Sequence, residues 1–252
     1  MNSPGQVGSP LPTRVIVSPH FDDGVLSASS LLADRRRSVL LTVFGGGPAS
    51  IRPITTWDKA CGFNEGDDVV TARTQEDASA CGVFDAYPVP LPHWDSQYRS
   101  AAYGYSGVSE AELAQQIAQS LHDVFTDHVS TMARGITEWC VPLGIGHQDH
   151  MLTAEGVRIW ASQRNDLTVT VFEDLPYAAR SVGLRDQALR RWEDFGWSLG
   201  PRDVVDTTPL KQMAADFYAS QNGGLGVDLQ LAVDTPETYY SASYGSGDLS
   251  RA

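Results

Sequence analysis

Short apolar runs alternate along the chain with segments whose apolar residues recur at helical spacing. Residues 14–17, 38–43 and 167–172 have the apolar and β-branched content of buried strands. Further strands are predicted at 83–91, 137–141 and 204–205, and helices at 23–35, 68–81, 109–124, 151–163, 183–194 and from 208 onward. Strands that alternate with helices predict a mostly parallel sheet with helices on both faces, a Rossmann-like α/β fold in a single domain.

The segments outside this pattern are less regular. Residues 1–13, rich in Gly, Pro and Ser, predict a flexible leader before a domain that spans 14–252. Residues 92–108 predict a long loop, which in compact domains often serves as a lid or a binding loop. The alternation of Thr with apolar residues in 167–172 predicts a strand near a sheet edge, and the tail from Leu225 shows no clear pattern. The helix from Thr208 is expected to bury Leu210, Met213, Ala214, Phe217 and Tyr218.

Composition narrows the classes of partner. The net charge of −13 argues against nucleic acid, because phosphate binding requires a basic face. Neither a signal peptide nor an apolar run of membrane-spanning length is visible, so we expect a cytoplasmic protein without a membrane partner. The three cysteines form no CxxC pair, which favours buried thiols over disulfides or a cysteine zinc site. The sequence leaves open whether the chain forms a homo-oligomer.

Two polar clusters stand where a predicted strand passes into a predicted helix. Ser18-Pro19-His20-Phe21-Asp22-Asp23 follows the first strand, and Gly146-His147-Gln148-Asp149-His150 follows the strand at 137–141. Ligands of open α/β sheets bind at the carboxyl ends of the strands. We therefore expect the two clusters to face each other across one pocket.

The residue types in these clusters predict a catalytic metal site. Catalytic zinc takes three protein ligands from His and carboxylate and keeps a fourth position open. His20 and Asp23 are three residues apart and supply two ligands from one tight turn, while His147 or His150 supplies the third. Two His and one carboxylate also suit Fe²⁺.

The remaining groups of the clusters predict hydrolysis of an amide. A metal lowers the pKa of bound water, and Asp22 is placed to act as the general base that takes its proton. The other His of the second cluster, held by a carboxylate such as Asp149, would stabilise a developing oxyanion.

The two clusters resemble the motifs of the PIG-L/LmbE-like family of zinc-dependent N-deacetylases, which carries PHPDD(E) after its first strand and HPDH later. The matching residues here are Pro19-His20-Phe21-Asp22-Asp23-Gly24 and His147-Gln148-Asp149-His150. By position, the resemblance implies zinc ligands at His20, Asp23 and His150. It also implies Asp22 as general base, and His147, supported by Asp149, as the residue that stabilises the tetrahedral intermediate.

Looser matches extend the resemblance over about residues 14–240. Arg73-Thr74-Gln75-Glu76 is similar to an R-x-x-E helix of the family, and His93-Trp94-Asp95 to an Asp-containing segment. Further along, Lys211 through Tyr218-Ala219-Ser220-Gln221 is similar to a late K…Y-x-SQ helix, and Pro236-Glu237-Thr238-Tyr239 to the closing strand region of the family. The resemblance implies substrate contacts at Arg73 and Asp95. Without it, Arg73 and Glu76 would be interpreted as a surface pair and Asp95 as a loop cap.

Two departures from the family pattern concern the pocket. Gly24 replaces a frequent Glu, and we expect this change to alter the surroundings of the ligands or to open the pocket. Some members carry a Tyr just before the second motif, which this chain lacks, so Tyr103, Tyr105 and Tyr177 are the candidates for its role.

Together these features predict a zinc- or iron-dependent hydrolase of linear amides. It would remove an N-acetyl group from an amino sugar such as N-acetylglucosamine, or from a small molecule that contains one, in bacterial secondary metabolism. Two alternatives remain: a hydrolase of another N-acyl small molecule at the same metal site, and a non-catalytic carbohydrate-binding protein of the same fold.

Overall fold

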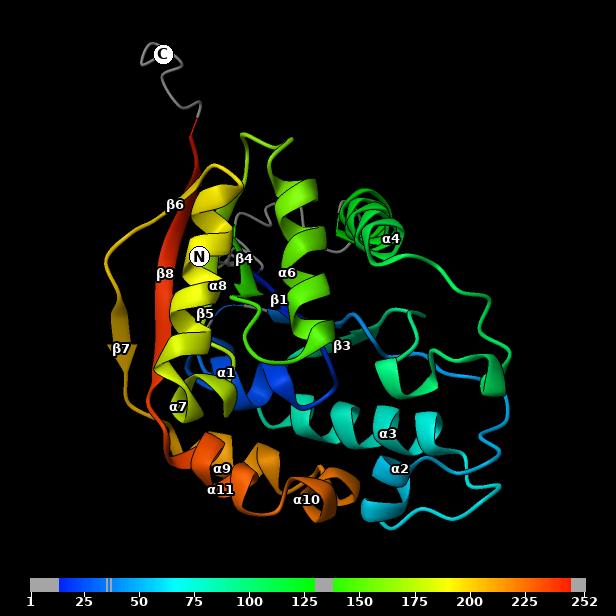
Figure 1. Ribbon diagram of the computed structural model, residues 1–252. Coiled ribbons are helices and arrows are strands. Elements are labelled where there is room, and N and C mark those ends of the chain that lie inside the picture. Colours follow the sequence, from blue (N-terminus) through cyan, green and yellow to red (C-terminus); the bar gives the residue numbers. More distant parts are fainter. Residues whose placement is uncertain (1–13, 35, 37, 130–137, 246–252) are drawn as a thin grey trace, which may run out of the picture.

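The computed structural model describes residues 14–34, 36, 38–129 and 138–245, so the predicted leader lies outside the described residues. An eight-stranded sheet has the order β3-β2-β1-β4-β5-β8-β6, and β7 pairs with β8 (Figure 1). The strands are β1 Arg14–Ser18, β2 Ser38–Thr42, β3 Tyr87–Pro90, β4 Glu138–Pro142, β5 Thr168–Phe172, β6 Trp197–Leu199, β7 Asp203–Val205 and β8 Glu237–Tyr244. The helices are α1 Asp23–Leu32, α2 Thr56–Ala60, α3 Val69–Gly82, α4 Glu110–Asp123, α6 Gln148–Ala161, α7 Tyr177–Arg180, α8 Val182–Asp194, α9 Pro209–Ala215, α10 Ala219–Leu225 and α11 Val227–Asp234.

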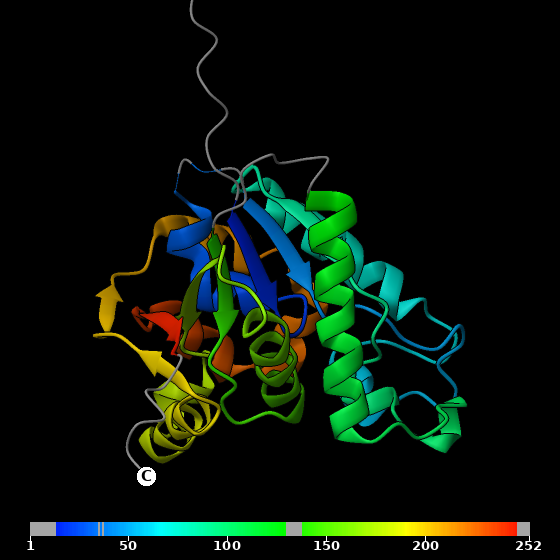
Figure 2. The same ribbon diagram turned by 90° about the horizontal axis from the view of Figure 1, so that it is seen from above.

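Helices cover both faces of the sheet, as the alternation of elements predicts (Figures 1 and 2). Successive strand side chains point to opposite faces. Val15 and Val17 pack in the apolar cluster that contains residues of α4, α6 and α8, whereas Ile16 packs in the cluster with α1, α3 and α9. The parallel strands are therefore buried on both sides, which explains their continuous apolar runs. Within the described residues, no helix combines the length and apolar character needed to cross a membrane.

The order of the parallel strands places both polar clusters at one edge of the sheet. The chain passes from β1 outward through β2 to β3, and then returns to place β4 on the other side of β1. A crevice forms where the strand order reverses in this way, outside the carboxyl ends of the strands. The first cluster follows β1 and the second follows β4, so both open onto this crevice.

The carboxyl-terminal third differs from the prediction. Strand β5 lies between β4 and the antiparallel β8 rather than near an edge. The helix predicted from Thr208 ends at Ala215, and α10 begins separately. The predicted stripe is therefore only partly confirmed: Ala214 and Tyr218 are buried, whereas Met213 and Phe217 are exposed. The tail without a pattern forms α11 and β8.

Strand β8 stabilises α1 through a buried carboxylate. Helix α1 is interrupted at Ala28, whose φ of −143° and ψ of 28° are not helical. The N–H groups of Ser29 and Ser30 start the next helical turn, and both donate to the carboxylate of Glu237 at 2.9 Å. The ammonium of Lys211 lies 3.5 Å from the same carboxylate, and both side chains are fully buried. Glu237 therefore caps the second half of α1 and neutralises a buried cation.

We expect replacement of Glu237 by Ala to lower the free energy of unfolding by about 3–5 kcal/mol, because it leaves Lys211 charged and unpaired in the interior. Urea unfolding followed by circular dichroism measures this loss. Glu65→Ala, at an exposed position, is the control and should change the free energy by less than about 0.5 kcal/mol. Equal effects of the two substitutions would contradict the buried network.

Candidate active site

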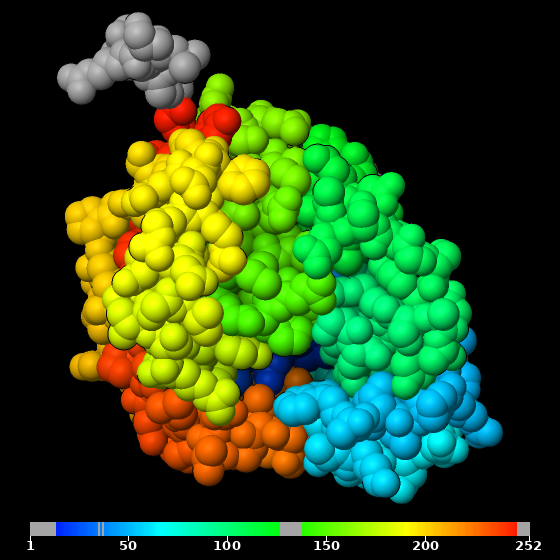
Figure 3. All heavy atoms as spheres, in the orientation of Figure 1, coloured from blue at the N-terminus to red at the C-terminus, as the bar shows by residue number. Residues whose placement is uncertain are grey.

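A cavity of about 320 Å³ opens at the carboxyl ends of β1 and β4. In Figure 3 it appears as a hollow with blue residues at its base, between the orange α10 region, the cyan α2 region and the yellow-green α7 region. Residues of both polar clusters line it, namely His20, Asp22, Asp23 and His147. Aromatic and apolar side chains form much of the remaining wall: Phe21, Leu26, Phe44, Trp57, Val70, Tyr98, Leu175, Pro176, Tyr177 and Leu225.

Three side chains from the two clusters converge on one point. The Oδ2 atom of Asp23 lies 3.0 Å from Nδ1 of His20 and 3.1 Å from Nε2 of His150. Ligand atoms of a tetrahedral zinc ion, each about 2.0–2.1 Å from the metal, lie about 3.3 Å apart. This spacing fits a metal ion held by His20, Asp23 and His150.

Each of the two histidines is oriented by a carboxylate on its other ring nitrogen. Nε2 of His20 lies 3.0 Å from Asp149, and Nδ1 of His150 lies 2.6 Å from Asp174. A carboxylate behind a histidine fixes the tautomer that presents a lone pair to a metal. Asp174 also accepts the N–H groups of Gly144 and Ile145 through its second oxygen, so it fixes the loop before α6 as well.

The site concentrates buried negative charge around these imidazoles. Burial alone would lower the pKa of His20, but hydrogen bonds to Asp149 and Asp23 raise that pKa well above its ordinary value. Burial would likewise lower the pKa of His150, but the charge of Asp23 and the contact with Asp174 raise it to about 9. A position that stabilises added positive charge on two imidazoles in this way also suits a divalent cation.

The adjacent carboxylates of the first cluster have different surroundings. Asp23 contacts His20 and His150, whereas the carboxylate of Asp22, the residue before α1, makes no capping hydrogen bond to that helix. Burial and the charge of Asp23 raise the pKa of Asp22 to about 7. Asp22 is thus free to bond a water molecule in the cavity, and a bound cation nearby would lower its pKa toward the ionised state.

His147 also borders the site, and the three imidazoles of the two clusters could form a metal group of their own, with nitrogens within 4.8 Å of one another. However, Nδ1 of His147 accepts the main-chain N–H of Asp149 at 3.2 Å. Burial and the neighbouring His20 and His150 lower its pKa to about 4, so the ring is neutral. A neutral ring that accepts at Nδ1 carries its proton on Nε2, from which it can donate a hydrogen bond.

Asp149 lies differently from the expectation that its carboxylate supports His147. That carboxylate contacts His20, accepts the N–H of Ser96 at 3.0 Å and pairs with Arg99. Its link to His147 runs through the main chain alone. Arg99 was not among the predicted site residues, because it lies within the segment predicted as a long loop. That segment in fact contains two short 3₁₀ helices, Ser96–Tyr98 and Ala101–Tyr103.

The two predicted substrate-contact residues both line the cavity. Arg73 is buried and pairs with Asp58 at 2.9 Å, so it is not a surface partner of Glu76. Its Nε atom has no hydrogen-bond partner. Asp95 caps the 3₁₀ helix Ser96–Tyr98 by accepting the N–H of Gln97 at 3.1 Å. The loop-cap interpretation therefore holds for Asp95, and its place in the cavity wall leaves a substrate contact open.

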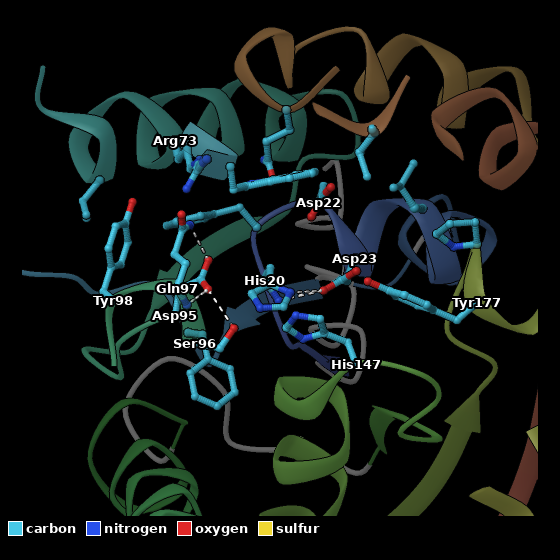
Figure 4. Close-up of a pocket in the computed structure, with 18 of the residues that line it drawn as sticks. His20, Asp22, Asp23, Arg73, Asp95, Ser96, Gln97, Tyr98, His147 and Tyr177 are labelled. Atoms are coloured by element: carbon cyan, nitrogen blue, oxygen red, sulfur yellow. Dashed lines mark hydrogen bonds and ion pairs between the residues drawn. The ribbon is translucent and has the colours of Figure 1, made fainter. Parts of the chain in front are cut away.

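The structure places Gly24 and the three candidate tyrosines, which are the two departures from the family motifs. A Cβ atom added to Gly24 would lie 2.4 Å from Leu40, so this position faces the core and does not open the pocket. Of the three candidate tyrosines, only Tyr177 lines the cavity, and its hydroxyl points toward Asp23 (Figure 4). Tyr103 donates instead to the carbonyl of Pro53, and Tyr105 packs on Trp94.

The chain is similar in sequence and in fold to known deacetylases. The family model of the GlcNAc-PI de-N-acetylases (PIG-L) matches residues 15–161. A 2′-N-acetylparomamine deacetylase from Niallia circulans is 28% identical over 236 residues, which cover 84% of this chain and 81% of that protein. Two solved structures share the fold: teicoplanin deacetylase in a zinc-inhibited form, and a deacetylase of the A40926 pseudoaglycone. The teicoplanin deacetylase has a TM-score of 0.73 at 24% identity, and the match covers 93% of this chain and 99% of that one. The A40926 pseudoaglycone deacetylase has a TM-score of 0.74 at 22% identity, and the match covers 94% of this chain and 100% of that one.

Proposed function

The chain belongs to the PIG-L family of de-N-acetylases, and we propose that it is a metal-dependent enzyme that removes an acetyl group from the nitrogen of an amino sugar or a small molecule containing one. The observation that carries the proposal is the convergence of His20, Asp23 and His150 beside the carboxylate of Asp22. The similarity to a 2′-N-acetylparomamine deacetylase supports an acetylated amino sugar as the class of substrate. We also propose that residues 14–252 form one catalytic domain.

Three side chains would hold a divalent metal: His20 through Nδ1, His150 through Nε2, and Asp23. Such a metal would polarise the amide carbonyl and lower the pKa of water. Asp149 and Asp174 keep the two imidazoles in the tautomers that this binding requires. Two-His-one-carboxylate sites also take iron, so zinc and Fe²⁺ are both candidates.

The remaining groups of the site supply proton transfer and charge stabilisation. Asp22 takes a proton from the water whose oxygen attacks the acetyl carbon, and it later gives that proton to the amide nitrogen. The C–N bond then breaks, yielding acetate and the free amine. His147 donates a hydrogen bond from Nε2–H to the oxygen of the tetrahedral centre, and the hydroxyl of Tyr177 is the second candidate donor.

A substrate screen tests the proposal. The protein, loaded in turn with Zn²⁺, Fe²⁺ or Mn²⁺, is incubated with N-acetylglucosamine, 2′-N-acetylparomamine and N-acetylated amino acids, and released acetate is measured. We expect acetate from at least one acetylated sugar and none after treatment with a chelator. Release from amino-acid amides alone would favour a different hydrolase. Sugar binding without turnover under every metal would favour a non-catalytic carbohydrate-binding protein.

A further inference from the structure

Gln221, on α10, presents an amide that the fold itself does not use. Its side chain lines the cavity and is only 5% exposed. The Nε2 atom is buried without a hydrogen-bond partner, and neither amide atom bonds to any other described residue. An unpaired buried amide destabilises a folded protein, so such groups usually have a partner that is absent from the unliganded state.

Contacts on both sides of Gln221 fix the position of helix α10. Glu76, on α3, caps α10 by accepting the N–H and the hydroxyl of Ser220 at 2.8 and 2.6 Å. On the other side, α10 packs tightly on α2, because a Cβ atom added to Gly224 would lie 2.8 Å from the ring of Trp57. Helix α10 therefore presents Gln221 to the cavity from a rigid support.

The surroundings of Gln221 have the character of a sugar site. Trp57 and Leu225 line the same cavity as Gln221 and supply apolar surface to it. Gln221 lines the same cavity as His20, Asp22 and Asp23, so α10 contributes to the wall that encloses the metal-binding and proton-transfer groups (Figure 4). A few polar groups set in an aromatic wall are what orients a small polar ligand.

Resting on the proposed function, we infer that Gln221 is a substrate-binding and specificity-determining residue whose amide hydrogen-bonds a hydroxyl or amino group of the amino sugar, with Trp57 against the face of the ring. Gln221 lies outside residues 15–161, which the family model matches, and is the last residue of the segment that resembles the late Y-x-SQ helix. The inference concerns how the site selects its sugar, and not the hydrolytic chemistry itself.

Replacement of Gln221 by Met tests the inference, because Met keeps the volume of the side chain but cannot make the hydrogen bond. Loss of one neutral hydrogen bond should weaken substrate binding about tenfold. We expect KM for the acetylated sugar to rise by that factor while kcat stays within about twofold. The melting temperature should stay unchanged or rise, because the substitution removes an unpaired buried amide. Dissociation constants of 2′-N-acetylparomamine, measured by calorimetry on Asp22→Asn and on Asp22→Asn/Gln221→Met, give binding apart from turnover.

Gln230→Met is the matched control, because Gln230 is exposed on α11 and bonds only Asp234. It should change neither KM nor the melting temperature. An unchanged KM and dissociation constant in Gln221→Met would overturn the inference, as would a fall in melting temperature that accompanies the loss of binding. Acetate release by the wild-type protein decides the proposed function separately, so the two failures are distinguishable.

Discussion

Asp22→Asn will retain its metal and lose most of its turnover. The carboxylate of Asp22 contacts neither His20 nor His150, so its replacement leaves the three proposed ligand atoms in place. An amide cannot accept the proton of the attacking water, and general-base catalysis typically contributes 10²–10⁴-fold. We therefore expect kcat to fall by about 10²–10⁴-fold, with KM little changed. Initial rates of acetate release and elemental analysis of the same preparation measure both effects.

The matched control for this variant is Asp85→Asn, an exposed position whose φ of 53° an asparagine tolerates. It should behave as the wild type. Asp22 is also buried, so the neutral amide should not lower the melting temperature. Near-normal turnover in Asp22→Asn would remove Asp22 from the role of base, and loss of the metal would show that it acts as a ligand.

The position of the site could be predicted because it depends on local patterns. A strand followed by a polar turn and a helix can be read from sequence, and parallel strands bring their carboxyl ends to one edge. His20 and His150 meet there for that reason. Asp174 was missed, although the same rule could have found it: it follows β5, the neighbour of β4. A carboxylate at the end of the next strand was the available signal.

The pattern of apolar and polar residues could not predict the carboxyl-terminal region, because tertiary contacts determine it. The family resemblance alone implied a closing strand at Pro236-Glu237-Thr238-Tyr239, where β8 begins. Strand β8 has the sequence ETYYSASY, with little apolar alternation, and it is fixed by pairing with three strands. Lys211 and Glu237 are each unfavourable in an interior, and their mutual contact, together with the N–H groups that Glu237 accepts from α1, compensates for their burial. Gln221 likewise belongs to the cavity because Glu76 and Trp57 position α10 from segments distant in sequence.

His150→Ala will bind little or no metal, and Asp174→Asn will bind it weakly. The first substitution removes a ligand atom and leaves only His20 and Asp23. In the second, an amide NH₂ group can take the place of the oxygen that faces Nδ1 of His150. The ring would then accept at Nδ1 and carry its proton on Nε2, the nitrogen that faces Asp23. Loss of such a supporting carboxylate typically weakens metal affinity 10–100-fold. Competition with a chromogenic chelator measures the metal affinity of the wild type and of each variant.

Two further histidine variants show whether the loss of metal is specific to the proposed ligands. His122, exposed on α4 and remote from both clusters in sequence, is the matched control, and His122→Ala should keep the metal affinity of the wild type. His147→Ala distinguishes the two ligand sets that the geometry offers. Because Nδ1 of His147 accepts the N–H of Asp149, we expect this variant to keep the metal and to lose turnover. If His147→Ala instead loses the metal while His150→Ala retains it, His147 is the third ligand and the assignment of His150 is wrong.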